Sequence, residues 1–486
     1  MRIDMASAIF DISIHEKIES ASCPLPSPWS RMPLRWTCMG IMHFRKATVM
    51  TANGAGRVEP ADGHRQQRGA TAGSTDPLIL NGPRKWVLMG SISFTLFILY
   101  VLYAGIIKVF LPNQVADIDP ANKINNLAGI LALMSIATTI ATPLSGALSD
   151  RLRTRWGRRA PFIAIGSLAA ALLTFGLSFA TTLMAITILW VMAAFCYNMM
   201  QVPMTTLIAD RFAPDDRGKA SGLLGAGQNI GTSVGVIVAG YLVVNLQLGY
   251  VLYGAAVLSC CIAFILVNRE PSSLHMEREP LRLGHFIRGF WISPREHPDF
   301  AWAFISRFAL YMGFTLITTY MLYILQDYIG LSRSEANAAI GRIFAIQLVG
   351  LLLSGVFSGF LSDRWGRRKP FVIQATILIA AAYAMPLLMP TMTGMYLYAG
   401  IVGIGYGAYT AVDMALMTQV LPKGGKSAGK DLGILIIALN IPLILGPVLA
   451  ALILNISGNS YATLFTVAAT LVAFSALLVL PIRSVR

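Results

Sequence analysis

Residues 146–162 read GALSDRLRTRWGRRAPF, and residues 359–371 repeat most of this pattern as GFLSDRWGRRKPF. Gly157 in the first copy and Gly366 in the second are 209 residues apart. Long apolar runs flank both copies. The repetition predicts a membrane protein built from two duplicated halves, each with the same basic loop at an equivalent place.

The composition is that of a membrane protein. Of the 486 residues, 55% are hydrophobic and 13% are charged, whereas soluble globular domains contain about 25% charged residues. The net charge of +15 does not indicate nucleic-acid binding, because the basic residues lie in the gaps between apolar runs, as they do in cytoplasmic membrane loops. The five cysteines and six histidines form no metal-ligand spacing, so we predict no metal, no cofactor and no disulfide framework.

The apolar runs set the fold class. A membrane-spanning helix needs about 20 mostly apolar residues, and the chain offers twelve such segments. We therefore predict an all-α membrane protein with two six-helix bundles, at residues 85–267 and 301–486. Lys and Arg collect in the gaps after the even-numbered spans, and positively charged loops stay in the cytoplasm. Both termini and the linker 268–300 are thus expected on the cytoplasmic side of the plasma (inner) membrane.

Two segments outside the spans have their own composition. Residues 1–84 are polar and lack helical periodicity, which predicts a disordered cytoplasmic tail. Met50 opens a stretch typical of an ordinary N-terminus, so a start at Met50 is an open alternative. Residues 281–292 mix basic and apolar side chains, which fits either an interfacial helix on the membrane or an ordinary linker.

A further basic segment supports a family resemblance. Residues 210–222 read DRFAPDDRGKASG. With the two repeated loops, this segment resembles the cytoplasmic signatures of the major facilitator superfamily, and the likeness covers roughly residues 86–482. The form SDR…GRRxPF is most similar to the sucrose-transporter-like and glycoside–cation symporter branches. The resemblance implies two bundles that alternate their opening around a binding site near the membrane midplane.

The resemblance also implies a conformational latch in the loops. Asp150 would cap the N-terminus of a helix in the other half, a favourable charge–dipole arrangement, and the neighbouring arginines would pair with Asp210. These contacts would hold the cytoplasmic side closed; the alternative is that the basic loops only set topology and contact lipid headgroups. Gly146 and Gly359 would allow close helix approach, and the first copy is expected to be the working latch. The predicted latch residues are Gly146, Asp150, Arg151, Gly157, Arg158, Arg159, Asp210, Gly359, Asp363, Arg364, Gly366, Arg367 and Arg368.

Two charges lie inside predicted spans, where ionisable residues are costly and mark functional candidates. Asp413 lies near the end of the tenth span, and Arg307 lies near the start of the seventh, so both are close to the cytoplasmic side. We expect them to pair, because an unpaired charge at that depth is expensive. Two roles stay open. Asp413 either exchanges a proton or holds a substrate hydroxyl, or the ion pair is permanent and orients the two helices.

Polar and aromatic side chains form stripes on several predicted helices. Tyr406 and Tyr409 fall on the same helical face as Asp413. A face that combines rings, amides and hydroxyls suits a neutral polyhydroxylated ligand, whereas a dicarboxylate needs more cavity-facing cations than the sequence offers. Packing between helices is the alternative for each single aromatic residue. The other candidates for substrate or proton binding are Tyr311, Tyr197, Gln201, Trp190, Gln228, Asn229 and Asn440.

The sequence thus favours a monomeric secondary active transporter, a proton-coupled symporter of a sugar or glycoside. A proton-coupled exporter of drugs or other small molecules with the same fold is the alternative, although such exporters carry a Gly-Pro motif in helix 5, where residues 225–231 read GAGQNIG. Sodium is an alternative coupling ion. An enzyme is not predicted, since the chain has no glycine-rich phosphate loop of the P-loop type.

Overall fold

The computed structural model describes residues 79–80, 82–275, 295, 297–420 and 428–482. Most of the predicted tail, the alternative start at Met50 and the segment 281–292 therefore lie outside the described residues. The described helices belong to one folded unit, Gly73–Arg486.

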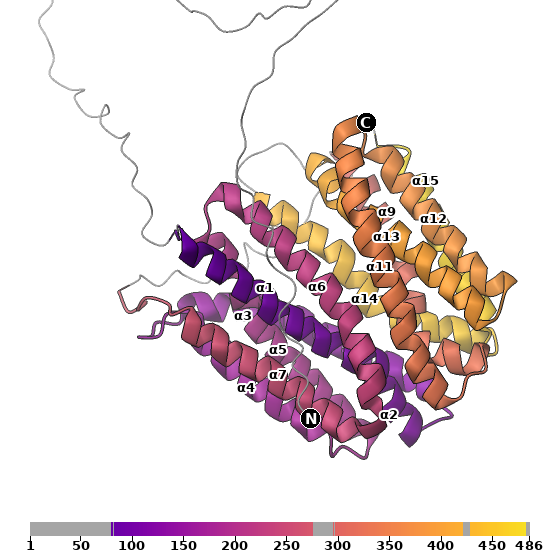
Figure 1. Cartoon of the computed structure of the whole chain (residues 1–486), viewed down its shortest axis with the longest axis horizontal. Helices are drawn as coiled ribbons and strands as arrows, with labels where there is room; N and C mark the ends of the chain where they lie inside the picture. The colour runs from indigo at the N-terminus through magenta and orange to yellow at the C-terminus, as the bar shows by residue number, and fades with distance from the viewer. Residues whose placement is uncertain (1–78, 81, 276–294, 296, 421–427, 483–486) are drawn as a thin grey trace, which may run out of the picture. The chain divides into compact units, whose positions relative to one another are not determined.

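Six long helical segments make up the first half of the described chain (Figure 1). Proline lies in the first turn of α1, α4 and α6, where the missing N–H costs no hydrogen bond. A π-helical turn, η1, interrupts the first segment. The elements are α1 (Pro83–Gly105), η1 (Ile106–Phe110), α2 (Leu111–Ile118), α3 (Lys123–Arg151), α4 (Ala160–Leu177), α5 (Leu183–Arg211), α6 (Pro214–Leu242), η2 (Val243–Asn245) and α7 (Leu246–Val267).

The second half repeats this plan with another six long segments among the described residues. Its first segment also contains a π-helical turn, η3. Ser332 and Glu335 form a capping box that begins the eighth segment. The elements are α9 (Pro298–Thr319), α10 (Met321–Tyr323), η3 (Ile324–Tyr328), α11 (Arg333–Trp365), α12 (Lys369–Leu388), α13 (Met392–Val420), α14 (Ala428–Ile456) and α15 (Tyr461–Val479).

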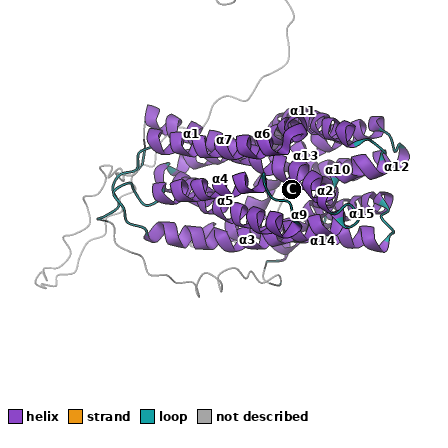
Figure 2. Cartoon of the chain, turned by 90° about the horizontal axis from the view of Figure 1, so that it is seen from below, coloured by secondary structure: helices purple, strands orange, loops and turns teal. Residues whose placement is uncertain are grey.

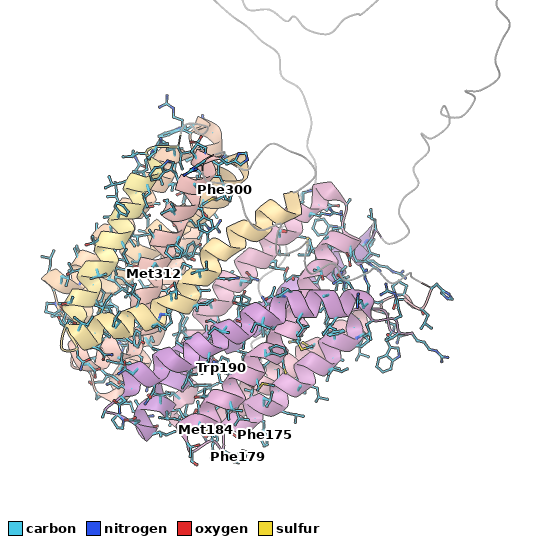
Figure 3. The ribbon with its side chains drawn as sticks, turned by 180° about the vertical axis from the view of Figure 1, so that it is seen from behind. Phe175, Phe179, Met184, Trp190, Phe300 and Met312 are labelled. Carbon is cyan, nitrogen blue, oxygen red and sulfur yellow. The ribbon has the colours of Figure 1, made fainter. Side chains whose placement is uncertain are left out.

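The helices have the length and apolarity of membrane spans. Within the described ranges, nine helical segments are long and apolar enough to cross a membrane, and one of them, Asp216–Val267, covers α6 from its third residue and the whole of α7. Large apolar side chains point outward, as Phe175, Phe179 and Met184 show in Figure 3. The described elements are all helices joined by loops (Figure 2). The predicted all-α architecture with twelve long helices is confirmed for this part of the chain.

Glycines allow the closest helix contacts inside each half. On α6, a Cβ at Gly227 would lie 3.2 Å from a backbone oxygen of α1, and one at Gly231 would lie 2.5 Å from another. Gly403 and Gly407 of α13 meet the backbone of α11 in the same way. A side chain larger than hydrogen would force these helices apart, so small residues set the spacing of both pairs.

The two halves meet along two helix pairs, α6 with α11 and α3 with α14. Because successive helices run in opposite directions, the unit has two ends. We call the end with the loops 152–159 and 366–368 the motif end, and the end with the loops 119–122 and 329–332 the opposite end. Figure 1 shows the helices of each half grouped together.

Candidate functional site

Arg307 of α9 and Asp413 of α13 come together in the second half. Arg307 is 3% exposed and Asp413 is 4% exposed, and Arg307 Nε lies 3.4 Å from Asp413 Oδ2. The contact is an ion pair with poor hydrogen-bond alignment, since Nε and Nη1 of Arg307 are buried without a hydrogen-bond partner among the described residues. Two donors of a buried cation are thus left unsatisfied, which is costly unless another acceptor reaches them.

Aromatic rings surround this pair. The guanidinium carbon of Arg307 lies 5.8 Å from the ring centre of Tyr311, a cation–π distance. The Tyr311 ring packs edge-on against Tyr406 and Tyr409, at centroid distances of 6.4 and 6.2 Å. Tyr406 in turn stacks on Phe314 at 4.6 Å. The stripe predicted on helix 10 therefore packs against α9 and encloses the charge pair.

The first half holds a similar ring cluster around Tyr103. Tyr103 packs edge-on against Trp190 and Tyr197, at 6.1 and 5.9 Å. Trp190 and Tyr197 are fully buried within this half. The Tyr197 hydroxyl lies 3.0 Å from the hydroxyl of Thr174 on α4. The contact with Thr174 shows that the Tyr197 hydroxyl faces α4. Gln201, also on α5, donates to the Tyr100 hydroxyl of α1 at 3.4 Å.

A cavity of about 230 Å³ lies between the two halves. Six hydroxyl groups, two amides and several apolar side chains line it, and none of these lining residues is charged. The Thr142 hydroxyl donates to Asn198 at 3.0 Å, so two of the polar lining groups are tied together. The lining residues are Ile107, Leu131, Met134, Ser135, Thr138, Thr139, Thr142, Asn198, Thr315, Thr319, Asn440, Leu443, Ile444 and Pro447.

Of the residues predicted for substrate or proton binding, Asn440 lies in the lining of this cavity. Gln228 and Asn229 are half-buried on α6, the helix that packs against α1. Sequence reasoning did not single out the polar face of α3. The sequence does contain a signal for this face, since Ser135, Thr138 and Thr142 are spaced three and four residues apart, as on one side of a helix.

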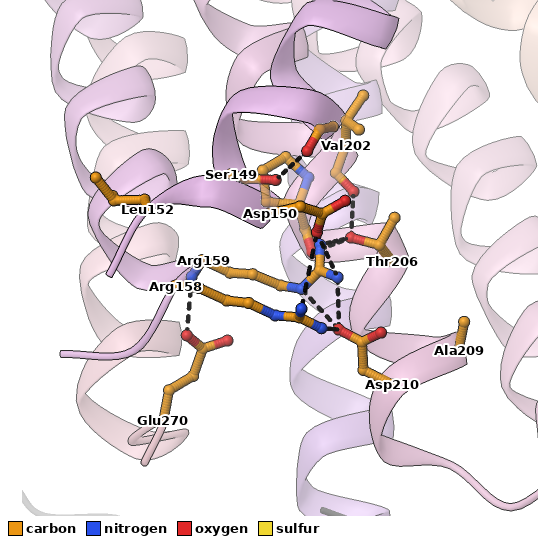
Figure 4. A network of polar contacts seen from close by, with 12 residues as sticks. Ser149, Asp150, Leu152, Arg158, Arg159, Val202, Thr206, Ala209, Asp210 and Glu270 are labelled. Carbon is orange, nitrogen blue, oxygen red and sulfur yellow. Dashed lines mark hydrogen bonds and ion pairs between the residues drawn. The ribbon is translucent and has the colours of Figure 1, made fainter. Parts of the chain in front are cut away.

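A charge network lies at the motif end of the first half (Figure 4). Asp210 Oδ2 accepts from Arg158 Nη2 at 2.7 Å and from Arg159 Nε at 2.8 Å. Asp150 Oδ1 lies 3.4 Å from Arg159 Nη2. Arg159 also donates to Thr206, and its side chain is only 4% exposed. The network joins the end of α3, the start of α4 and the end of α5.

Glu270 completes this network, although sequence reasoning did not identify it. Its Oε2 accepts from the backbone N–H of Arg159 at 2.9 Å and of Ala160 at 3.3 Å, at the start of α4 (Figure 4). A carboxylate at a helix N-terminus satisfies free N–H groups and interacts favourably with the helix dipole. Gly157 has a φ of +92°, and a Cβ there would overlap the Glu270 side chain. Glycine is therefore required at position 157 for two reasons: the backbone has a positive φ, and any Cβ would overlap the Glu270 side chain.

The predicted cap by Asp150 on a helix N-terminus of the other half stays a prediction. In this structure Asp150 pairs with Arg158 and Arg159 of its own half. Gly146 and Gly359 do not need to be glycine for close packing, because a Cβ at either would lie 3.9 Å from its nearest neighbour, an ordinary contact.

The second loop copy is less extensively paired in the described part of the chain. Gly366 ends α11 in the left-handed conformation, with φ +61°. Arg364 and Arg367 are exposed, and Arg368 is half-buried with a partner. The side chain of Asp363 lies outside the described residues. Arg151, in the first copy, is half-buried at the last residue of α3.

Polar contacts join the two halves at the opposite end, and these contacts were not predicted. Arg333 makes a two-pronged ion pair with Asp117 and donates to Asn113 at 2.9 Å. Asn113 and Asn337 exchange side-chain hydrogen bonds although both are buried. These contacts hold the halves together at this end, which is therefore closed. Further cross-half contacts here are Lys123–Asp327, Tyr320–Ile124, Tyr323–Pro112 and Asn455–Asn125.

The loop into α3, next to these contacts, is fixed by local hydrogen bonds. Asp119 accepts from the side chains of Asn122 and Asn126. These bonds, with Asn122 contributing most, lower the pKa of the Asp119 carboxyl below its ordinary value. The turn that presents Lys123 to the second half is therefore best held when Asp119 is ionised.

The chain belongs to the Major Facilitator Superfamily. The family model matches residues 92–332 and 303–486, which include both halves and both loop motifs. The protein is accordingly a multi-pass integral membrane protein and a transporter of small molecules, not an enzyme. The predicted superfamily and transport class are confirmed.

Three curated relatives are transporters. The chain is 36% identical over 83 residues to the niacin transporter NiaP of Acinetobacter baylyi (17% of this chain, 18% of the relative). It is 29% identical over 126 residues to the isoprimeverose transporter of Lactiplantibacillus pentosus (24% of this chain, 25% of the relative). It is 24% identical over 310 residues to the cis,cis-muconate transport protein of Acinetobacter baylyi (61% of this chain, 72% of the relative). The matched region spans a quarter or less of the first two relatives' length.

Solved transporter structures share the fold. A mutant of the nucleoside transporter NupG superposes with a TM-score of 0.64 at 14% identity, over 81% of this chain and 99% of that structure. A bacterial homologue of the human lysosomal transporter Spinster, inward-facing and unoccupied, gives 0.58 at 16% identity, over 83% and 99%. At these identities the similarity concerns the fold alone.

Proposed function

We propose that this protein is a proton-coupled symporter of a sugar or glycoside, in or near the sucrose-transporter-like and glycoside–cation symporter branches. The observation that carries the substrate class is the cavity between the halves, whose lining offers hydroxyls and amides but no charged side chain. Neutral polyhydroxylated molecules bind through such groups, while a charged substrate needs a counter-charge. The local similarity to an isoprimeverose transporter supports the same class.

Asp413 is the candidate proton carrier in this proposal. Arg307 and the cavity residue Thr315 are eight residues apart on α9, about 12 Å along the helix axis. Asp413 lies beside Arg307 and outside the lining residues, so it acts on the proton and leaves the sugar hydroxyls to the cavity. On α9, Tyr311 lies between Arg307 and Thr315, and its backbone oxygen accepts a hydrogen bond from the Thr315 hydroxyl at 2.7 Å. A change in the charge pair is thus transmitted to the cavity through one helix.

The arrangement of the halves indicates which side of the membrane the described state faces. The opposite end is closed by cross-half ion pairs. We infer that the motif end faces the cytoplasm of the plasma (inner) membrane with both termini, so the described state opens inward. A single chain contains both halves, and we propose that the monomer is the working unit.

Reconstituted full-length protein tests this function. Uptake of labelled monosaccharides, disaccharides and glycosides into proteoliposomes is measured with and without an acidic external buffer. Asp413→Asn is expected to abolish gradient-driven uptake and to retain sugar exchange at zero gradient, since exchange needs no net proton release. Gradient-driven uptake that survives in Asp413→Asn overturns the proton role. Replacing the proton gradient with a sodium gradient identifies the ion.

A carboxylate is a second candidate substrate, favoured by Lys108. This half-buried lysine follows the cavity residue Ile107 in the π-helical turn η1, and its Nζ lies 4.5 Å from the ring centre of Phe344 in the other half. In the described part of the chain Lys108 has no anionic partner. Two relatives are named as transporters of niacin and of muconate. Lys108→Gln is expected to remove carboxylate uptake in this case and to spare sugar uptake.

Export is the remaining alternative for the same fold. The same vesicles, loaded with lipophilic cations and given the reversed pH gradient, distinguish it. If these cations are extruded and none of the sugars is taken up, the protein is an exporter and the symporter proposal is wrong.

A further inference from the structure

A second pocket, separate from the cavity between the halves, lies at the motif end of the first half. Its volume is about 480 Å³. Three helix ends enclose it: the start of α1, the end of α5 and the end of α7 with the residues that follow. The lining residues are Leu80, Arg84, Val87, Leu88, Leu207, Arg211, Leu266, Val267, Asn268, Arg269 and Glu270.

The pocket carries an excess of positive charge. It contains the three arginines Arg84, Arg211 and Arg269 and one carboxylate, Glu270. Glu270 Oε2 is already engaged by two backbone N–H groups of α4. In the part of the chain that the structure describes, none of the three guanidinium groups is ion-paired, and Arg211 Nε is buried without a hydrogen-bond partner. Three arginines against one committed carboxylate make a site for an anion.

The rim of the pocket is apolar and faces outward. Val87, Leu266 and Val267 line the pocket, and each has at least half of its surface exposed. Trp86, which precedes Val87 in the chain, is also exposed, and Lys85 Nζ lies 5.3 Å from the centre of its ring. Tryptophan beside basic residues at a helix end is typical of the headgroup level of a membrane. The pocket thus combines an anion site with an apolar flank at the membrane surface.

From this combination we propose that the pocket binds an anionic glycerophospholipid. The phosphate group lies among Arg84, Arg211 and Arg269, and the acyl chains follow the exposed apolar side chains of α1 and α7. Free phosphate has the same anionic chemistry but would gain nothing from the apolar flank. The bound lipid joins the start of α1 to α5 and α7, where Asn268 already donates to Ser91 of α1 at 2.8 Å.

Native mass spectrometry of the full-length protein in detergent tests this site. Phosphatidylglycerol, phosphatidylcholine and inorganic phosphate are titrated separately as probes. The wild type is expected to retain phosphatidylglycerol, and Arg211→Gln/Arg269→Gln is expected to bind it about 30-fold more weakly. Arg155→Gln is the matched control, because Arg155 is an exposed arginine at the same end but outside the pocket, and it should bind like the wild type.

The outcomes separate the alternatives. Equal retention of phosphatidylcholine, or an unchanged affinity in the double variant, overturns the proposal. If inorganic phosphate binds as well as phosphatidylglycerol, the proposal that the ligand is a lipid is overturned. If Arg155→Gln loses as much affinity for phosphatidylglycerol as the double variant, the lipid is attracted to the basic surface in general and not to this pocket. If the double variant does not give a monodisperse size-exclusion peak, Arg84→Gln at the exposed start of α1 replaces it, with an expected loss of about fivefold.

Discussion

Replacing Gly157 by alanine is expected to destabilise the first half through two separate effects. The backbone at Gly157 has a φ of +92°, and an L-residue in this region costs about 1–2 kcal/mol. The new Cβ would also overlap Glu270, whose carboxylate accepts two backbone hydrogen bonds at the start of α4. Losing these charge-assisted bonds at a half-exposed position costs about 2 kcal/mol in total. The expected loss in free energy of unfolding is therefore about 3–4 kcal/mol.

Two other glycines provide matched controls in the same protein. Gly366, in the second copy of the loop, has a φ of +61° but no atom within 4 Å of its would-be Cβ. Gly366→Ala should therefore cost only the backbone term, about 1–2 kcal/mol. Gly146 lies inside a helix, and its Cβ would meet Val202 at 3.9 Å. Gly146→Ala should be neutral or stabilising by up to about 1 kcal/mol, because alanine is the better helix former.

Equilibrium unfolding of the purified full-length variants by denaturant measures these differences. A double-mutant cycle with Glu270→Gly separates the two effects at Gly157, because glycine removes both the carboxylate and the Glu270 Cβ, which would overlap the new Cβ. In the Glu270→Gly background the cost of Gly157→Ala should fall to the backbone term alone, giving a coupling of about 2 kcal/mol. If Gly157→Ala costs no more than Gly366→Ala, or if the cycle shows no coupling, the proposed role of Glu270 as the cap of α4 is refuted.

Three further predictions concern the network, the closed end and the cavity. Asp210→Asn should lower the free energy of unfolding by about 2–3 kcal/mol, since the nearly buried Arg159 loses its main anion; an unchanged denaturation midpoint would contradict this. Asp117→Asn should open the opposite end, because Arg333 loses its two-pronged partner. In a background in which serine replaces the native cysteines, thiol labelling of a cysteine introduced at the buried Ala336 should rise, and the swap Asp117→Arg/Arg333→Asp should restore protection. Asn440→Ala should raise the KM for the sugar about tenfold and leave the free energy of unfolding within about 0.5 kcal/mol; equal KM values would place the substrate elsewhere.

The sequence determines the fold because the lipid solvent leaves few alternatives. In hydrocarbon every backbone polar group needs an internal partner, so long apolar runs must be helices. The duplicated loops, from Gly146 and from Gly359, then identify the two halves and the superfamily. The pairing of Arg307 with Asp413 was also expected from sequence, since a charge inside an apolar helix needs a counter-charge.

The tertiary structure decides which faces meet, because helical periodicity does not give the rotation of a helix against its neighbours. Tyr197 and Tyr406 occupy equivalent places in the repeat, and each packs against the first helix of its half, α1 or α9. The Tyr197 hydroxyl lies against Thr174 of α4, whereas the ring cluster of Tyr406 encloses the ion pair of Arg307 and Asp413. Glu270 follows a span as an ordinary loop acid, and only the fold brings it to the start of α4. The ion pair between Asp117 and Arg333 joins residues 216 positions apart, at the end of α2 and the start of α11, and neither helix end indicates its partner by sequence.

The repeated loop motif illustrates both contributions. Its sequence determines a basic turn at the end of a helix, with glycine where φ is positive in each copy. Its partners are decided by the fold: Asp210 and Glu270 surround the first copy, and the Cβ site of Gly366 in the second has no neighbour among the described residues. The physical reason is that a turn depends on local backbone sterics, whereas an ion pair depends on which helix ends are packed side by side.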